Sequence, residues 1–110
     1  MTAIGDRKME MDGGEAILEA FRRLGIEYII SSPGSEWAPM WEALNRQRAS
    51  GTAGPNYIQC WHELLATDIA ACFTLMTGRP QAVLLHAASG VLHGSLGIYA
   101  ANRAEKRTTM

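Results

Sequence analysis

The chain is expected to be an α/β protein with a parallel sheet and helices on both faces, on three observations. Its 110 residues, 47% hydrophobic and 19% charged, suit one globular domain. Segments with helical spacing alternate with short β-branched runs, in the order helix, then strand and helix three times, which is typical of a parallel sheet. No further strand follows the last helix, so we expect an incomplete sheet of about three strands with both edges open.

The first helix is predicted over residues 12–24. Asp12 can cap it, and Glu15 stands three residues further on, as in a capping box. Gly25 ends the helix. Residues 1–11 have no sustained hydrophobic period, so we expect them to be a leader. The apolar face of this helix is formed by Ile17, Leu18, Phe21 and Leu24.

The middle of the chain predicts two strands that flank a helix. The first strand, EYIIS at 27–31, is rich in β-branched and aromatic residues, and Pro33 and Gly34 end it with a turn. A helix follows from about Trp37 to Arg48. The loop ASGTAGPN then leads to the second strand, YIQC.

The third helix is predicted from about His62 to Thr77, before the stop signals Gly78 and Pro80. It is apolar nearly all round, so we expect it to be buried on more than one side, in part by something outside this segment. The third strand is QAVLLH, and a turn rich in small residues opens a fourth helix within ASGVLHGSLGIYAAN. We expect EKRTTM to follow that helix, which places the domain at 12–107 and a tail at 108–110.

Charge and cysteine content exclude several classes of function. Ten basic residues against eleven acidic ones, with no basic stripe, give no electrostatic footprint for a nucleic acid or an anionic membrane. No apolar run approaches the roughly 20 residues that span a bilayer. Cys60 and Cys72 lie in apolar runs without metal-like or disulfide-like spacing, and no signal segment opens the chain. We therefore expect a cytoplasmic protein.

Three turns at the carboxyl ends of the predicted strands hold the chemically notable residues. Ligands of parallel α/β sheets bind in such turns. The turns are SPGSE after the first strand, WHE after the second and HAASGVLH after the third. We expect them to converge on one edge of the sheet.

Together these motifs resemble a known family. The segment HELLATDIAACFTLMTGRP opens a helix with His-Glu and ends at a TGRP stop before an apolar strand; SSPGSE and LLHAASGVLHGSLGI complete the pattern. They are similar to the N-terminal pyrimidine-binding domain of thiamine-diphosphate-dependent enzymes of the acetolactate synthase and 2-oxo-acid decarboxylase family, and look most like its benzoylformate-decarboxylase-like members. The resemblance covers roughly residues 12–104 and implies the flavodoxin-like fold of that domain.

The resemblance gives Glu63 the role of the family glutamate that hydrogen-bonds a ring nitrogen of the cofactor's aminopyrimidine and so activates the cofactor. It implies a carboxyl group whose pKa is raised by burial and that shares a proton with the ring. Taken alone, Glu63 also fits a first-turn acid that stabilises a helix dipole.

The resemblance also assigns the other site residues. Ser35 is a candidate hydrogen-bond donor to the substrate carboxylate, and His86 is a candidate proton relay. Pro33 and Gly34 form a turn that passes close to the cofactor or substrate, where a side chain would obstruct. The cofactor-binding residues implied are Pro33, Gly34, Glu63, Gly90 and His93.

Cofactors and partners follow from the same resemblance. The cofactor is thiamine diphosphate, and magnesium is held with the diphosphate by a separate carboxyl-terminal domain that this chain lacks. The expected partners are that missing domain or a second subunit, in a homo-oligomer when complete, and a small 2-oxo acid as substrate. The isolated chain is expected to be inactive.

Other interpretations of the same residues stay open. No metal site is predicted: WHELLA fails the HExxH pattern because residue 66 is alanine, and a structural role is the simpler interpretation of His62, His86 and His93. The chain could instead be a catalytically inactive truncated fragment that acts as an interaction module with a related full-length subunit. A third hypothesis is a stand-alone flavodoxin-like small-molecule binder.

Overall fold

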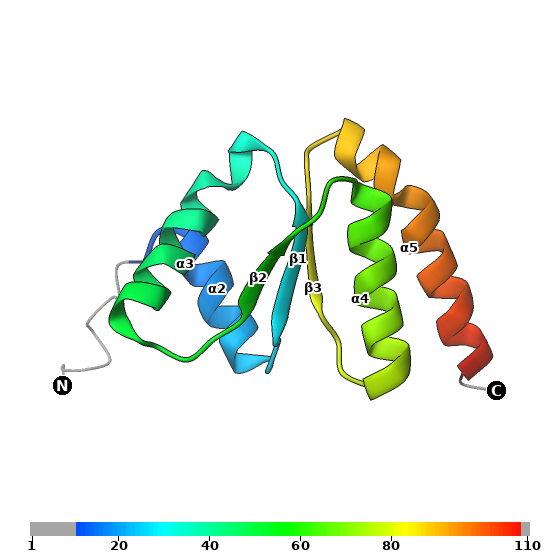
Figure 1. Cartoon of the computed structure of the whole chain (residues 1–110), viewed down its shortest axis with the longest axis horizontal. Coiled ribbons are helices and arrows are strands. Elements are labelled where there is room, and N and C mark those ends of the chain that lie inside the picture. The colour runs from blue at the N-terminus through cyan, green and yellow to red at the C-terminus, as the bar shows by residue number, and fades with distance from the viewer. Residues whose placement is uncertain (1–10, 109–110) are drawn as a thin grey trace, which may run out of the picture.

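A computed structural model describes residues 11–108, and side chains for residues 11–104. It confirms an α/β fold with one three-stranded parallel sheet and helices on both of its faces (Figure 1). Ten of the eleven residues of the expected leader, and residues 109–110 of the expected tail, lie outside the described part. The elements are α2 (Gly13–Arg23), β1 (Tyr28–Ser32), the 3₁₀ turn η1 (Ser35–Trp37), α3 (Ala38–Ser50), β2 (Asn56–Gln59), α4 (Glu63–Thr77), β3 (Ala82–Leu85) and α5 (Ser89–Thr108).

The order of the strands is β2-β1-β3, with β1 in the centre. The chain passes from β2 back across β1 to reach β3, so α3 and α4 lie on opposite faces of the sheet (Figure 1). This reversal makes a topological switch point between the carboxyl ends of β1 and β3. Open α/β sheets bind their ligands in the crevice at such a point.

The start and end of α2 agree with the sequence prediction, and its apolar face agrees in part. Oδ1 of Asp12 accepts a hydrogen bond from the backbone N–H of Glu15 at 2.8 Å, and Gly25 follows the helix with a φ of +72°. Leu18 is fully buried, but Leu24 is 70% exposed. The predicted apolar face is therefore too wide, because Leu24 is the C-cap residue at the end of the helix and its side chain is exposed.

Each face of the sheet has its own hydrophobic core. The core beneath α2 and α3 consists of Leu18, Ile26, Ile29, Met40, Ala43, Ala82 and Leu84. The core beneath α4 is smaller and consists of Ile30, Cys60, Ala66 and Ala70. Two consecutive residues of β1, Ile29 and Ile30, face opposite cores, as the two-residue period of a strand requires. The central strand β1 is thus buried on both faces, whereas the edge strand β2 is mostly exposed.

Gly14 lets α2 and α3 pack closely. A Cβ placed on Gly14 would overlap the carbonyl oxygen of Pro39 and lie 2.9 Å from the backbone nitrogen of Met40. Both obstructing atoms belong to the main chain at the start of α3. Gly13, one residue earlier, has nothing within 4 Å of the same position.

Helix α4, the third helix predicted from the sequence, is only partly covered by the described residues. Ala66, Thr67 and Ala70 of α4 are buried, but Leu75 and Met76 are 53% and 87% exposed. On α5, Leu92 is 72% exposed. Within the described residues, α5 covers one side of α4, the sheet covers another, and Leu75 and Met76 face outward.

Helix α5, the fourth helix predicted from the sequence, is longer than predicted. It continues through residues 105–108, where we expected a tail after the helix. Its buried glycines Gly94 and Gly97 face α4: a Cβ on Gly97 would overlap the Thr67 side chain. Close approach between two helices therefore explains Gly97, whereas the atom nearest to a Cβ on Gly94 is Cδ1 of Leu85 in β3, 3.0 Å away. No described helix is long and apolar enough to cross a membrane.

Candidate functional site

The turns after the strands converge on the carboxyl edge of the sheet, as the sequence predicts. The indole Nε1–H of Trp37, which follows β1, donates to the carbonyl oxygen of Leu85 at the end of β3 at 2.9 Å. The N–H of Cys60, which follows β2, donates to the carbonyl oxygen of Ser31 at 2.7 Å. These bonds fasten the three strand ends to one another.

A carboxylate and a histidine meet at the switch point between β1 and β3. Oε1 and Oε2 of Glu36 lie 2.8 and 2.9 Å from Nδ1 of His86, and Oε1 also accepts the backbone N–H of Ala87 at 2.7 Å. A Cβ on Gly34 would overlap both the His86 ring and the Glu36 carboxylate. A glycine is therefore needed at position 34 for the contact between Glu36 and His86, two residues of this chain.

The charge of Glu36 decides which nitrogen of His86 carries a proton. Its own backbone N–H, then the N–H of Ala87 and His86, hold the pKa of Glu36 below the ordinary 4.5. An ionised carboxylate only accepts hydrogen bonds, so Nδ1 of His86 must carry the proton that it donates to Glu36. Nε2 is then the ring nitrogen that can take up or release a proton. The contribution of this pair to stability is present above the ordinary pKa and is lost as the pH falls through the lowered one.

Replacing Glu36 with alanine is expected to remove this fixed tautomer. His86 is 45% exposed, so without the carboxylate its ring exchanges between both neutral tautomers in water. Nitrogen-15 chemical shifts of the imidazole ring, measured above pH 8, distinguish the two tautomers. Glu42→Ala, on the exposed face of α3, is the control. An unchanged His86 spectrum in Glu36→Ala would contradict the role given to Glu36.

Glu63 is the first residue of α4 and its side chain is only 12% exposed. Its Oε2 lies 3.4 Å from Nδ1 of His93 on α5. The pKa of Glu63 is lowered, chiefly by its own backbone N–H at the helix start and then, against the opposing effect of burial, by His93 and His62. The sequence-based expectation of a raised pKa is therefore wrong for this chain, because helix-end hydrogen bonding and two histidines outweigh desolvation.

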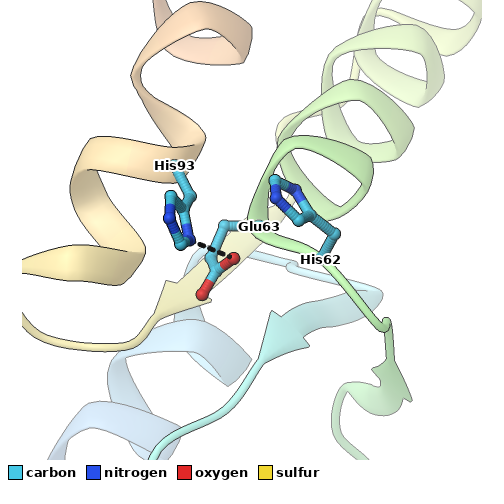
Figure 2. Close-up of side chains that lie close together, drawn as sticks. All are labelled: His62, Glu63 and His93. Carbon is cyan, nitrogen blue, oxygen red and sulfur yellow. Dashed lines mark ion pairs between the residues drawn. The ribbon is translucent and has the colours of Figure 1, made fainter.

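Two histidines accompany Glu63. His62 caps α4, since its Nδ1 accepts the backbone N–H of Leu64 at 3.0 Å, and its ring stacks on that of His93 with centroids 5.3 Å apart. Ligand atoms of His62, Glu63 and His93 all lie within 4.8 Å of one another. Figure 2 shows the three side chains gathered where the start of α4 faces α5.

Gly90 connects the two groups of polar side chains. A Cβ on Gly90 would lie 2.7 Å from Cβ of His86 and 3.2 Å from Oε1 of Glu63. His86 and Glu63 are thus near neighbours around this glycine. Gly90 and His93 lie in the first turns of α5 rather than in the turn where the sequence placed them, because α5 begins at Ser89.

The remaining predicted residues lie at the same edge. Pro33 is half-buried between β1 and η1, and Ser35 is exposed at the start of η1. Sequence reasoning missed Glu36 and His62 as partners of the site. The signal for Glu36 was its place in the SPGSE turn, and the signal for His62 was its place directly before the helix, where an N-cap residue is expected.

Comparison with known proteins gives one match. Residues 11–107 match the family model described as thiamine pyrophosphate enzyme, N-terminal TPP binding domain. The chain matches no curated protein and no solved structure. Because the matched segment covers nearly the whole chain, and the α/β fold agrees with it, the chain belongs to the N-terminal TPP-binding domain family of the thiamine pyrophosphate enzymes.

Proposed function

We propose that this domain supplies the pyrimidine side of the cofactor site in a 2-oxo-acid decarboxylase or acetolactate-synthase-like enzyme. One observation carries the proposal. The largely buried carboxylate of Glu63 lies at the carboxyl edge of the sheet, beside a second polar pair formed by Glu36 and His86. A site with one buried acceptor and one oriented histidine suits a reaction that needs both cofactor activation and proton transfer.

The residues present fit an aminopyrimidine. Oε2 of Glu63 is paired with His93, while Oε1 faces the space beside Gly90, where a side chain would obstruct it. The lowered pKa keeps Glu63 ionised, so the carboxylate accepts a hydrogen bond from a protonated ring nitrogen. Thiamine diphosphate, when bound, supplies the electron sink that decarboxylation of a 2-oxo acid requires.

His86 and Ser35 would act on the substrate side. Glu36 positions His86 by accepting its Nδ1–H, so that Nε2 holds or releases the proton. Ser35 is exposed next to this pair in sequence, and its hydroxyl can donate to a substrate carboxylate. In this proposal His86 is a catalytic residue and Glu36 is a positioning residue.

The proposal needs a partner for the diphosphate. The diphosphate and its magnesium ion would be held by a second domain, on the same chain or on another subunit of a homo-oligomer. The exposed apolar side of α4 and α5 supports an interaction with such a partner. Next to it, a cavity of about 770 Å³ lies between α4, α5 and β3, lined by residues such as Ala70, Leu75, Val83, Ile98 and Ala101.

Release of CO₂ tests the proposal. The chain, assembled with the diphosphate-binding domain, is incubated with thiamine diphosphate, magnesium and a set of 2-oxo acids. We expect CO₂ release with at least one acid, dependent on both additions, and the organic product then separates decarboxylation from carboligation. Cofactor binding without CO₂ release from any acid would contradict the proposed reaction.

The second candidate function is an inactive interaction module. The exposed apolar residues of α4 and α5, such as Met76 and Leu92, favour it. In that case the chain associates stably with a related full-length subunit, and adding thiamine diphosphate and magnesium to the complex gives no turnover beyond that of the subunit alone.

A further inference from the structure

We propose that His62, Glu63 and His93 form a binding site for a zinc ion. Each side chain offers one ligand atom, and these atoms lie within 4.8 Å of one another. Two imidazoles and one carboxylate are a donor set that zinc uses in proteins, with water in the fourth position. HExxH places its two histidines on one helix, whereas here α5 supplies the second one (Figure 2).

The pair between Glu63 and His93 already has the spacing that a shared ion needs. Zinc bonds of about 2.0–2.2 Å at tetrahedral angles place neighbouring ligand atoms about 3.3–3.6 Å apart. Oε2 of Glu63 lies 3.4 Å from Nδ1 of His93. That distance is longer than a charge-assisted N–H···O bond of about 2.7–2.9 Å, so an ion can enter without widening the pair.

His62 has to change its hydrogen bonding when the ion binds. Its Nδ1 accepts the N–H of Leu64, so the neutral ring carries its proton on Nε2. Ligation through Nδ1 takes that lone pair, and ligation through Nε2 moves the proton to Nδ1. Both routes release the Leu64 amide. The ring is exposed, so no packed core prevents it from turning.

The donor set selects zinc over magnesium. Imidazole nitrogen suits zinc and other late first-row ions, whereas magnesium and calcium prefer sites made of oxygen alone. The proposed ion is therefore different from a magnesium ion held with a diphosphate. Glu63 is mostly buried and His93 is 57% exposed, so the site is open to solvent on the α5 side.

Zinc at this site would occupy the carboxylate that the proposed function assigns to the cofactor ring. Zinc and thiamine diphosphate would then exclude each other from Glu63. This consequence rests on the proposed function, whereas zinc binding by the chain alone does not. Binding to the isolated chain therefore tests the metal site by itself.

The test is calorimetric titration of the full chain with zinc chloride, together with optical spectra after cobalt(II) is added. We expect one zinc ion per chain, the strong visible absorption of tetrahedral cobalt, and a shifted Leu64 amide signal in the NMR spectrum. Magnesium chloride is expected to produce none of these changes. No saturable zinc binding, or binding that leaves the Leu64 amide unchanged, would overturn the proposal.

Variants locate the ion. His93→Gln and His62→Asn are each expected to weaken zinc binding by about tenfold or more, since loss even of an outer-shell partner costs about 10–100-fold. Asparagine still caps α4, and glutamine is a good helix residue, so both variants should fold, which circular dichroism checks. Cys72→Ser, which removes an exposed metal-binding group elsewhere on α4, should keep the wild-type affinity. Equal zinc affinity of His93→Gln and wild type would refute the site.

Discussion

Glu63→Gln is expected to reduce turnover of a 2-oxo acid by the assembled enzyme about 10²–10⁴-fold, the usual contribution of one acid–base group. Glutamine keeps the size of the side chain but removes the negative charge of the carboxylate, which accepts a hydrogen bond from a protonated ring nitrogen. The fold should survive, because the ion pair to be lost joins Glu63 to a half-exposed His93 and such pairs contribute little. Steady-state assays at saturating thiamine diphosphate measure the effect.

Asp68→Asn is the matched control for that experiment. Asp68 is an exposed acid on the same helix, one turn beyond the site. It should leave turnover within about twofold, because its charge is screened by solvent. Turnover of Glu63→Gln equal to that of Asp68→Asn would show that Glu63 is only an acid of the first helical turn.

Gly14→Ala is expected to destabilise the fold by about 1–3 kcal/mol, the usual cost of forcing extra volume into a packed contact. The added methyl group meets the backbone of Pro39 and Met40, which cannot rotate away as a side chain would. The two helices must therefore separate over the core that contains Leu18. Urea unfolding, followed by circular dichroism, measures the change.

Gly13→Ala provides the comparison for Gly14→Ala. Both glycines lie in the first turn of α2, but a methyl group at Gly13 meets nothing within 4 Å. Alanine is a better helix former than glycine by about 1 kcal/mol or less, so this variant should be as stable as wild type or more so. Similar midpoints for the two variants would show that α2 and α3 do not pack as described.

Much of the fold could be predicted from local patterns. Capping by Asp12, the turn at Pro33 and Gly34 and the stop at Gly78 are local chemistry, and each is found where expected. The extent of the last helix was not predicted, because polar residues at its end match a helix and a tail equally well. The width of the α2 face was overestimated because periodicity does not reveal which side chains at the end of a helix stay exposed.

The candidate site could be predicted only as far as its location. The rule that ligands bind at strand ends placed Glu63 and His86 on one edge. The link between Glu36 and His86 depends on the pairing of β1 with β3. The order of strands along the chain does not reveal which strands pair. The pKa of Glu63 was predicted in the wrong direction because its own backbone N–H at the helix start, and then His93 from a different helix, lower it more than burial raises it.

The central position of β1 has a consequence for synthesis of the protein. β1 is the first of the three strands to leave the ribosome, yet the strands that pair with it begin only at Asn56 and Ala82. Until β3 has emerged, one edge of a strand that contains Ile29 and Ile30 stays unpaired, and such edges invite aggregation. Contacts between residues this far apart in the sequence also slow folding. The nascent chain is therefore most prone to aggregation before residues 82–85 have been synthesised.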